Sequence, residues 1–76
     1  MTERMKNFLA DFRDLLEKYD ASFNDYECYE VTFSISDEHC HEHATWALRN
    51  SKENYCCVDA EHFNDYLEIS CYPRKN

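Results

Sequence analysis

The sequence predicts an α+β fold in which one N-terminal helix packs on an antiparallel sheet of about four strands. Over residues 3–19, apolar residues recur at intervals of three and four, the spacing of one face of a helix. After Asp20 the interval changes to two, the spacing of one face of a strand. The length of 76 residues fits one small unit, so we expect residues 1–76 to form a single domain.

The helix predicted over residues 3–19 has its own start and stop signals. Thr2 is a suitable N-cap because its hydroxyl can accept from the N–H groups of the first turn, and Glu3 follows it. Lys18 lies near the C-terminus, where the helix dipole favours a cation. The expected sheet-facing side chains are Met5, Phe8, Leu9, Phe12, Leu15, Leu16 and Tyr19.

Four later segments are predicted as strands: residues 29–36, 44–49, 55–58 and 66–72. In the first, the odd positions are apolar and the even positions are polar. In the second, Trp46 and Leu48 are expected to point inward. The last places Leu67, Ile69 and Cys71 on one face and Glu68 and Ser70 on the other. An antiparallel meander with the helix across it would bury every apolar face.

The chain contains no glycine, so turns that need a positive φ must use Asn or Asp. The candidate turns are Asn24-Asp25, Arg49-Asn50, Glu53-Asn54 and Asn64-Asp65. Residues 20–26 and 59–66 both begin Asp-Ala and end Phe-Asn-Asp-Tyr, which we interpret as one type of turn used twice rather than as a true duplication. A short helical turn over 59–65, capped by Asp59, is the alternative for the second copy.

Acidic residues dominate the chain, which has a formal net charge of −8. Between Lys18 and Arg74 the only cations are Arg49 and Lys52. Such a field repels nucleic acid and anionic lipid and attracts basic protein surfaces, so we expect a basic protein partner and neither direct nucleic-acid nor membrane binding. The expected charge contacts are Glu27, Glu30, Asp37, Glu38, Glu42 and Glu68, with Tyr26, Tyr29 and Tyr72 as aromatic anchors.

Carboxylates along a strand can imitate the phosphates of a nucleic-acid backbone. Alternate strand positions are about 6.5–7 Å apart, close to the spacing of successive phosphates on one strand. Acidic residues of the sheet edge and loops could thus occupy a groove built for nucleic acid. The simpler interpretation of the same charge is solubility, and both remain open.

A metal site is the alternative reading of one segment. His39, His41 and His43 would share one face of an extended backbone, and Cys56, Cys57 or Cys28 could complete a tetrahedral zinc site. The segment lacks the Cys-x-x-Cys or His-x-x-x-His spacing of structural zinc sites, so we favour a polar, imidazole-rich surface without a cofactor.

The residue pattern does not favour an enzyme. A Cys nucleophile with a His base could be assembled, but negative surroundings would raise the thiol pKa, which opposes nucleophilic attack. Glycine-rich phosphate loops are excluded because the chain has no glycine. Without a signal-peptide pattern we expect a soluble intracellular protein whose five cysteines are reduced thiols.

In style, the chain resembles the small acidic accessory proteins of bacteriophages, including anti-CRISPR proteins and other inhibitors of host defence. The likeness covers one opening helix ending LLEKYDASF, a compact set of strands, high acidity and no catalytic signature. The resemblance implies a non-enzymatic inhibitor in the bacterial cytoplasm. Such a protein occludes a site on a nucleic-acid-handling complex, most readily a CRISPR effector.

Overall fold

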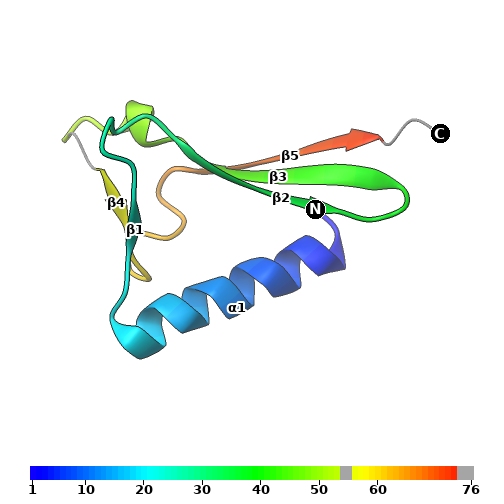
Figure 1. The fold of residues 1–76 in the computed structure, drawn as a ribbon, viewed down its shortest axis with the longest axis horizontal. Helices are drawn as coiled ribbons and strands as arrows, with labels where there is room; N and C mark the ends of the chain where they lie inside the picture. Colours follow the sequence, from blue (N-terminus) through cyan, green and yellow to red (C-terminus); the bar gives the residue numbers. More distant parts are fainter. Residues whose placement is uncertain (54–55, 74–76) are drawn as a thin grey trace.

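The computed structural model describes residues 1–53 and 56–73, and it confirms the α+β class with one N-terminal helix. The described residues form two small antiparallel sheets beside the helix, a three-stranded one in the order β2-β3-β5 and a two-stranded one of β1 and β4. Figure 1 shows α1 below the longer sheet, with β1 and β4 at the end where α1 finishes. The elements are α1 (Glu3–Tyr19), β1 (Phe23–Asn24), β2 (Val31–Ser36), β3 (Cys40–Trp46), the 3-10 helix η1 (Leu48–Asn50), β4 (Cys57–Val58) and β5 (Leu67–Pro73).

Helix α1 begins and ends as its sequence signals predict. The Thr2 hydroxyl accepts from the N–H of Met5 at 3.2 Å, which makes Thr2 the N-cap. Asp20 follows the last helical residue in the left-handed conformation, with φ 51° and ψ 45°. The N–H of Ala21 then bonds the carbonyl of Leu16 at 2.9 Å, which satisfies a carbonyl of the last turn. An aspartate thus takes the positive φ that glycine usually provides, but the expectation that only Asn or Asp would do so was wrong, because Cys28 has φ 54°.

The longer sheet begins and ends near the predicted boundaries except in its central strand. β2 starts two residues later than expected, and β5 is displaced by one residue at each end. The prediction of a strand over 44–49 was wrong at both ends, because β3 covers 40–46 and residues 48–50 form η1. The alternation of apolar and polar residues did not reveal the first part of β3, because an inward-facing position there is occupied by the charged but buried Glu42.

The two-stranded sheet takes the place of the strand predicted over 55–58. In that segment Cys57–Val58 form β4, which pairs with Phe23 and Asn24 of β1, whereas Cys56 is not in a strand and Tyr55 lies outside the described residues. The predicted turn Glu53-Asn54 also falls partly outside them, at Asn54. Residues 61–66 form a series of turns, and the Asp59 carboxylate accepts from the N–H of His62 at 2.9 Å, much as the capped-turn alternative predicts.

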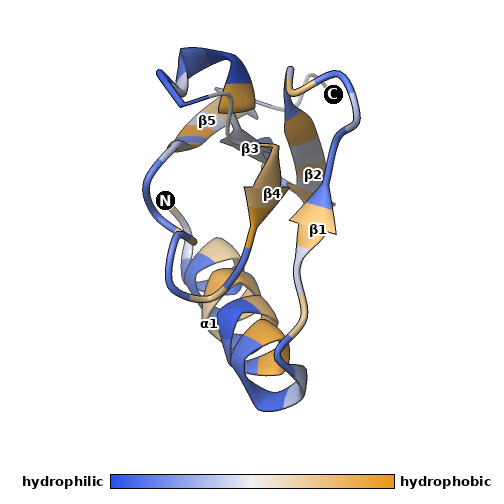
Figure 2. Ribbon diagram, turned by 90° about the vertical axis from the view of Figure 1, so that its left-hand side faces the viewer, coloured by the Kyte–Doolittle hydropathy of each residue, from blue (hydrophilic) through white to orange (hydrophobic). Residues whose placement is uncertain are grey.

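An aromatic core joins the helix to both sheets. Trp46 and Phe63 are almost fully buried with their ring centroids 5.2 Å apart, and the Trp46 indole N–H donates to the carbonyl of Phe63 at 2.7 Å. Figure 2, which views the molecule from the end where α1 finishes, shows β1 and β4 in front of the longer sheet and above α1, with β4 coloured hydrophobic. The other buried hydrophobic residues are Met5, Leu9, Leu16, Ala44, Ala47, Leu48 and Val58.

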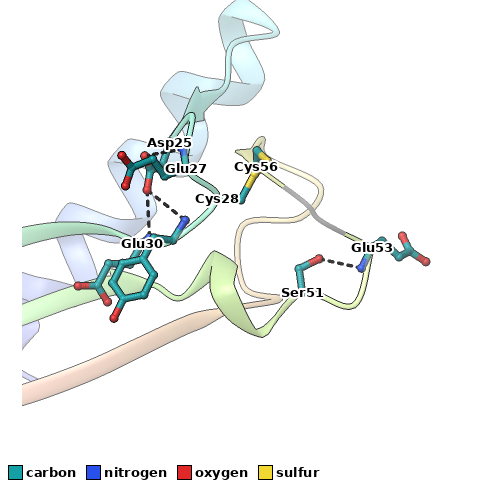
Figure 3. The surroundings of a disulfide bond; sticks show 8 residues. Asp25, Glu27, Cys28, Glu30, Ser51, Glu53 and Cys56 are labelled. Atoms are coloured by element: carbon teal, nitrogen blue, oxygen red, sulfur yellow. Dashed lines mark hydrogen bonds between the residues drawn. A yellow bond between two sulfur atoms is a disulfide. The ribbon is translucent and has the colours of Figure 1, made fainter.

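A disulfide joins Cys28 to Cys56, so the expectation that all five cysteines are reduced was wrong for this pair (Figure 3). The pairing of β1 with β4 brings the two cysteines together, and the N–H of Asp25 bonds the carbonyl of Cys56 at 3.1 Å. Sequence spacing cannot give such a partner, because it depends on which strands pair. Cys40, Cys57 and Cys71 are free thiols.

Candidate interaction surface

The face of the longer sheet that points away from α1 carries a regular array of polar side chains. Facing residues of the three strands form cross-strand rows, and the middle row consists of Ser34, His43 and Ser70. The Thr32 and Thr45 hydroxyls are hydrogen-bonded at 2.9 Å, and the Ser34 hydroxyl lies 2.9 Å from Nδ1 of His43. This face is therefore rich in hydroxyl and imidazole groups rather than carboxylates.

The predicted metal ligands are not brought together. His41 and His43 do share one face of β3, and each ring is hydrogen-bonded through Nδ1 to a serine of β2. His39, however, lies in the exposed turn between the strands, and the sulfur of Cys56 is committed to the disulfide. Cys57 lies on β4, in the other sheet. In residues 1–53 and 56–73, no three His, Cys, Asp or Glu side chains are placed to hold a metal ion.

One group of predicted contact residues lies in the turn before β2. The Asp25 carboxylate accepts from the N–H groups of Glu27, Tyr29 and Glu30 at 3.1–3.2 Å (Figure 3). These bonds, that from Glu27 first, lower the pKa of Asp25 and keep it ionised. The turn projects Tyr26 into solvent with 96% of its surface exposed, and Glu27 is exposed beside it.

Arg49 gathers three of the predicted contacts into one cluster. Its guanidinium lies 2.9 Å from the Glu30 carboxylate and 3.7 Å from that of Glu68. The same guanidinium lies 5.5 Å from the ring centroid of Tyr29, within cation–π range. Glu30 and Glu68 are therefore partly neutralised, and such surface pairs contribute about 0–1 kcal/mol each to stability.

The second acidic group forms the tip of the β2–β3 hairpin. The Asp37 carboxylate accepts from the N–H groups of Cys40 and His39 at 2.8 and 2.7 Å. These bonds, that from Cys40 first, lower the pKa of Asp37. Glu38 and His39 are both strongly exposed at the tip. Tyr72 lies on the outer sheet face with its ring centroid 5.3 Å from that of His43.

Glu42 is not a surface contact, which corrects the prediction for this residue. Only 2% of its surface is exposed, and its carboxylate accepts from the backbone N–H and the hydroxyl of Thr2. The carboxylate therefore lies at the N-terminus of α1, where the helix dipole favours a negative charge. Glu42 joins β3 to the start of the helix and belongs to the fold.

The free thiol of Cys40 is not activated as a nucleophile. A hydrogen bond with Cys71, followed by burial and then the charges of Asp37 and Glu42, raises the pKa of Cys40 to about 11. The direction agrees with the expectation that acidic surroundings raise a thiol pKa. Cys40 is thus protonated at neutral pH and is a poor attacking group.

An acid-lined depression of about 370 Å³ was not predicted from the sequence. Its acidic lining residues are Glu17 in the last turn of α1, Asp20 just after the helix, Asp59 and Glu61, and Arg13 provides one cation. The Asp-Ala pairs that begin the two similar segments both line this depression, but their similarity in sequence does not predict that they lie together. Nδ1 of His62 lies 2.8 Å from the Asp59 carboxylate.

Comparison of the chain with protein-family models, curated proteins and solved structures finds no match. No helix within the described ranges is long and apolar enough to cross a membrane.

Proposed function

We propose that the protein is a non-enzymatic binder of a basic protein surface, of the kind that handles nucleic acid. The supporting observation is the acidity around β2: residues 19–48 contain no Lys or Arg, and the next cation in the sequence, Arg49, pairs with Glu30 and Glu68. Asp25 and Glu27 precede this strand, whereas Asp37 and Glu38 follow it at the hairpin tip, at the opposite end of the sheet in Figure 1. The resemblance to phage inhibitors points to a host-defence effector, such as a CRISPR effector, as the partner.

The arrangement favours occlusion over strict phosphate mimicry. In the described strands the carboxylates are Glu42, which is buried, and Glu68, which contacts Arg49. No row of carboxylates on alternate positions is present there. The two acidic groups are instead separated by the length of β2, about 20 Å at 3.3 Å per residue. They suit two separate basic patches on the partner. The exposed Tyr26, which lies between Asp25 and Glu27 in the first group, would serve as an aromatic anchor.

The test is the association rate with a basic, nucleic-acid-handling complex recovered with the tagged protein and then purified. Electrostatic steering predicts that the rate falls at least about tenfold between low and high salt. Glu38→Lys should slow association more than Asp14→Lys, which makes the same charge change on the exposed face of α1. Equal effects of the two variants, or a rate insensitive to salt, would reject the proposal.

A competition assay tells whether the protein binds in the nucleic-acid groove of the complex, as phosphate mimicry requires, or elsewhere on its surface. If the protein occupies the nucleic-acid groove, DNA or guide RNA should displace it from the complex, because both ligands need the same cations. Simultaneous saturable binding of both would place the contact outside that groove and remove phosphate mimicry.

A further inference from the structure

β2 is an edge strand without the features that usually prevent a further strand from pairing. Within the described chain, only β3 pairs with it, and the register runs unbroken from Val31 to Ser36, so no bulge interrupts the strand. Its sequence, VTFSIS, contains no charged residue and no proline, although 32% of the whole chain is charged. The opposite edge differs, because β5 carries Glu68 and ends at Pro73. Charges and proline commonly protect edges, so β5 is protected and β2 is open.

An apolar trough lies beside this open edge. Phe8, Phe12 and Leu15 of α1, together with Asp11, line a depression of about 340 Å³. Phe33 extends from the inner face of β2 against it, with ring centroids 5.9 Å from Phe8 and 5.2 Å from Phe12. Leu15 is 54% exposed and Phe33 is 37% exposed, so both offer contact surface. In Figure 1, β2 is the strand of the longer sheet nearest the viewer.

We propose that β2 accepts an extended segment of a basic partner as an added antiparallel strand. Alternate side chains of that segment would lie over the trough, while its backbone satisfies the outward N–H and C=O groups of β2. This inference rests on the proposed function, since it names how the basic partner is held.

Charge determines the sequence that such a segment should have. Glu30, which Arg49 partly neutralises, precedes β2, and Asp37 follows it seven residues further along the chain. A strand with a Lys or Arg at each end, seven residues apart, would face both. A second copy of this chain fits poorly, because antiparallel self-pairing would bring the acidic residues before β2 of each copy close to those after β2 of the other. Each copy also has a formal net charge of −8, so the two copies repel one another.

The experiment uses the full chain and the synthetic peptide Lys-Thr-Val-Thr-Val-Thr-Val-Lys, with a control peptide in which both Lys are Glu. We expect saturable binding of the Lys peptide by NMR and, on binding, at least about tenfold slower exchange of alternate β2 amides. The β5 amides should be unchanged, and the Glu peptide should bind more weakly. Absence of saturable binding, equal binding of the two peptides or protection of β5 would overturn the proposal.

Two variants of α1 test the trough itself. Leu15→Lys should weaken peptide binding at least about fivefold, because it removes apolar contact area and repels the Lys side chains. Tyr19→Lys places the same charge on the same helix at a similarly exposed residue outside the trough, and it should bind like the parent. If both variants weaken peptide binding equally, the added positive charge alone explains the effect, and the inference is overturned. A peptide-free dimer in sedimentation that Leu15→Lys dissolves would also overturn it in favour of self-pairing.

Failure of this inference differs from failure of the proposed function. If the basic complex still binds with steep salt dependence and Glu38→Lys still slows association, but neither peptide nor Leu15→Lys has an effect, the partner is held by charge alone. If no salt-dependent association occurs, the proposed function fails as well.

Discussion

Three aspartate side chains hold the turns of this glycine-free chain. Asp25, Asp37 and Asp59 each accept hydrogen bonds from N–H groups two to five residues further along. These bonds lower the pKa of all three carboxyls, because each stabilises the ionised form. Some carboxylates of the chain therefore stabilise the fold, whereas others are available to a partner. Glu42 of β3, which binds Thr2 at the start of α1, is one of those that stabilise the fold.

At the same scale, the Asp59–His62 pair gives a pH prediction. Hydrogen bonds from His62, its N–H first, lower the pKa of Asp59 below 3.8, so this contribution is lost as the pH falls through the folded-state value. The Asp59 carboxylate raises the pKa of His62 above 6.5, so that contribution is complete below 6.5 and is lost as the pH rises through the raised value. The pair should therefore stabilise the fold most between about pH 4 and 6.5.

NMR titration of His62 is the measurement. Its pKa should fall toward the ordinary value in Asp59→Asn, whereas Asp14→Asn on α1 should leave it unchanged. A His62 pKa that is the same in Asp59→Asn and the parent would show that the contact does not persist in solution.

At the scale of elements, one helical side chain joins the layers. The Phe12 ring lies 5.2–5.9 Å from the rings of residues on β1, β2 and β3, and from Phe63 in the turns before β5. Aromatic pairs at such separations add about 0.5–1.5 kcal/mol each beyond the burial of area. Phe12 is only half-buried, yet no other position of α1 touches as many elements by ring contacts among the described residues.

Phe12→Ala should therefore lower the free energy of unfolding by about 3–5 kcal/mol, much of the stability of so small a domain. The matched control is Leu15→Ala, one turn further along α1 and more than half exposed, which should change stability by less than about 1 kcal/mol. Urea denaturation followed by circular dichroism measures both. Similar losses in the two variants would mean that the apolar face of α1 packs differently.

The elements also show where the sequence was informative. The bounds of α1 follow from its own residues, because the spacing of its apolar side chains, the cap at Thr2 and the cation at Lys18 are all local signals. The start of β3 depends on Glu42, whose partner Thr2 lies 40 residues away, so alternation alone could not reveal it. β1 has two residues and no periodicity to detect. Of the interaction surface, the exposed Tyr26 and Glu27 follow the predicted turn Asn24-Asp25, and Glu38 was predicted from its charge. The open edge of β2 depends on strand order, which the sequence does not show.

At the scale of the whole molecule, the disulfide crosses between regions that otherwise share a few backbone contacts. Cys28 adopts φ 54°, a conformation that costs a non-glycine residue roughly 1–2 kcal/mol, and its N–H donates to the carbonyl of Asp25 at 2.9 Å. Disulfides are rare in the cytosol, where thiols are kept reduced. A cytoplasmic partner would therefore require that the chain still folds when this bond is reduced, or that the bond resists reduction.

Replacing both Cys28 and Cys56 by Ser should lower the free energy of unfolding by about 3–4 kcal/mol, the loop-closure value for a separation of 28 residues. Cys71→Ser, at an exposed free thiol, is the control and should have little effect. When the parent protein is denatured without reductant and then alkylated, mass spectrometry should find three labelled cysteines. Labelling of all five would show that the bond is absent.

The chain has one tryptophan, and its position has a practical consequence. Trp46 is fully buried, and its ring meets those of Phe12, Phe23, Phe33 and Phe63, which come from α1, β1, β2 and the turns before β5. Its fluorescence therefore reports on the junction of nearly every element from a single chromophore. Emission should be short in wavelength in the folded protein and move to long wavelength only when that junction opens to water. A ligand on the polar sheet face should leave the emission unchanged, whereas a strand added at β2, whose Phe33 touches the indole, should perturb it without exposing it.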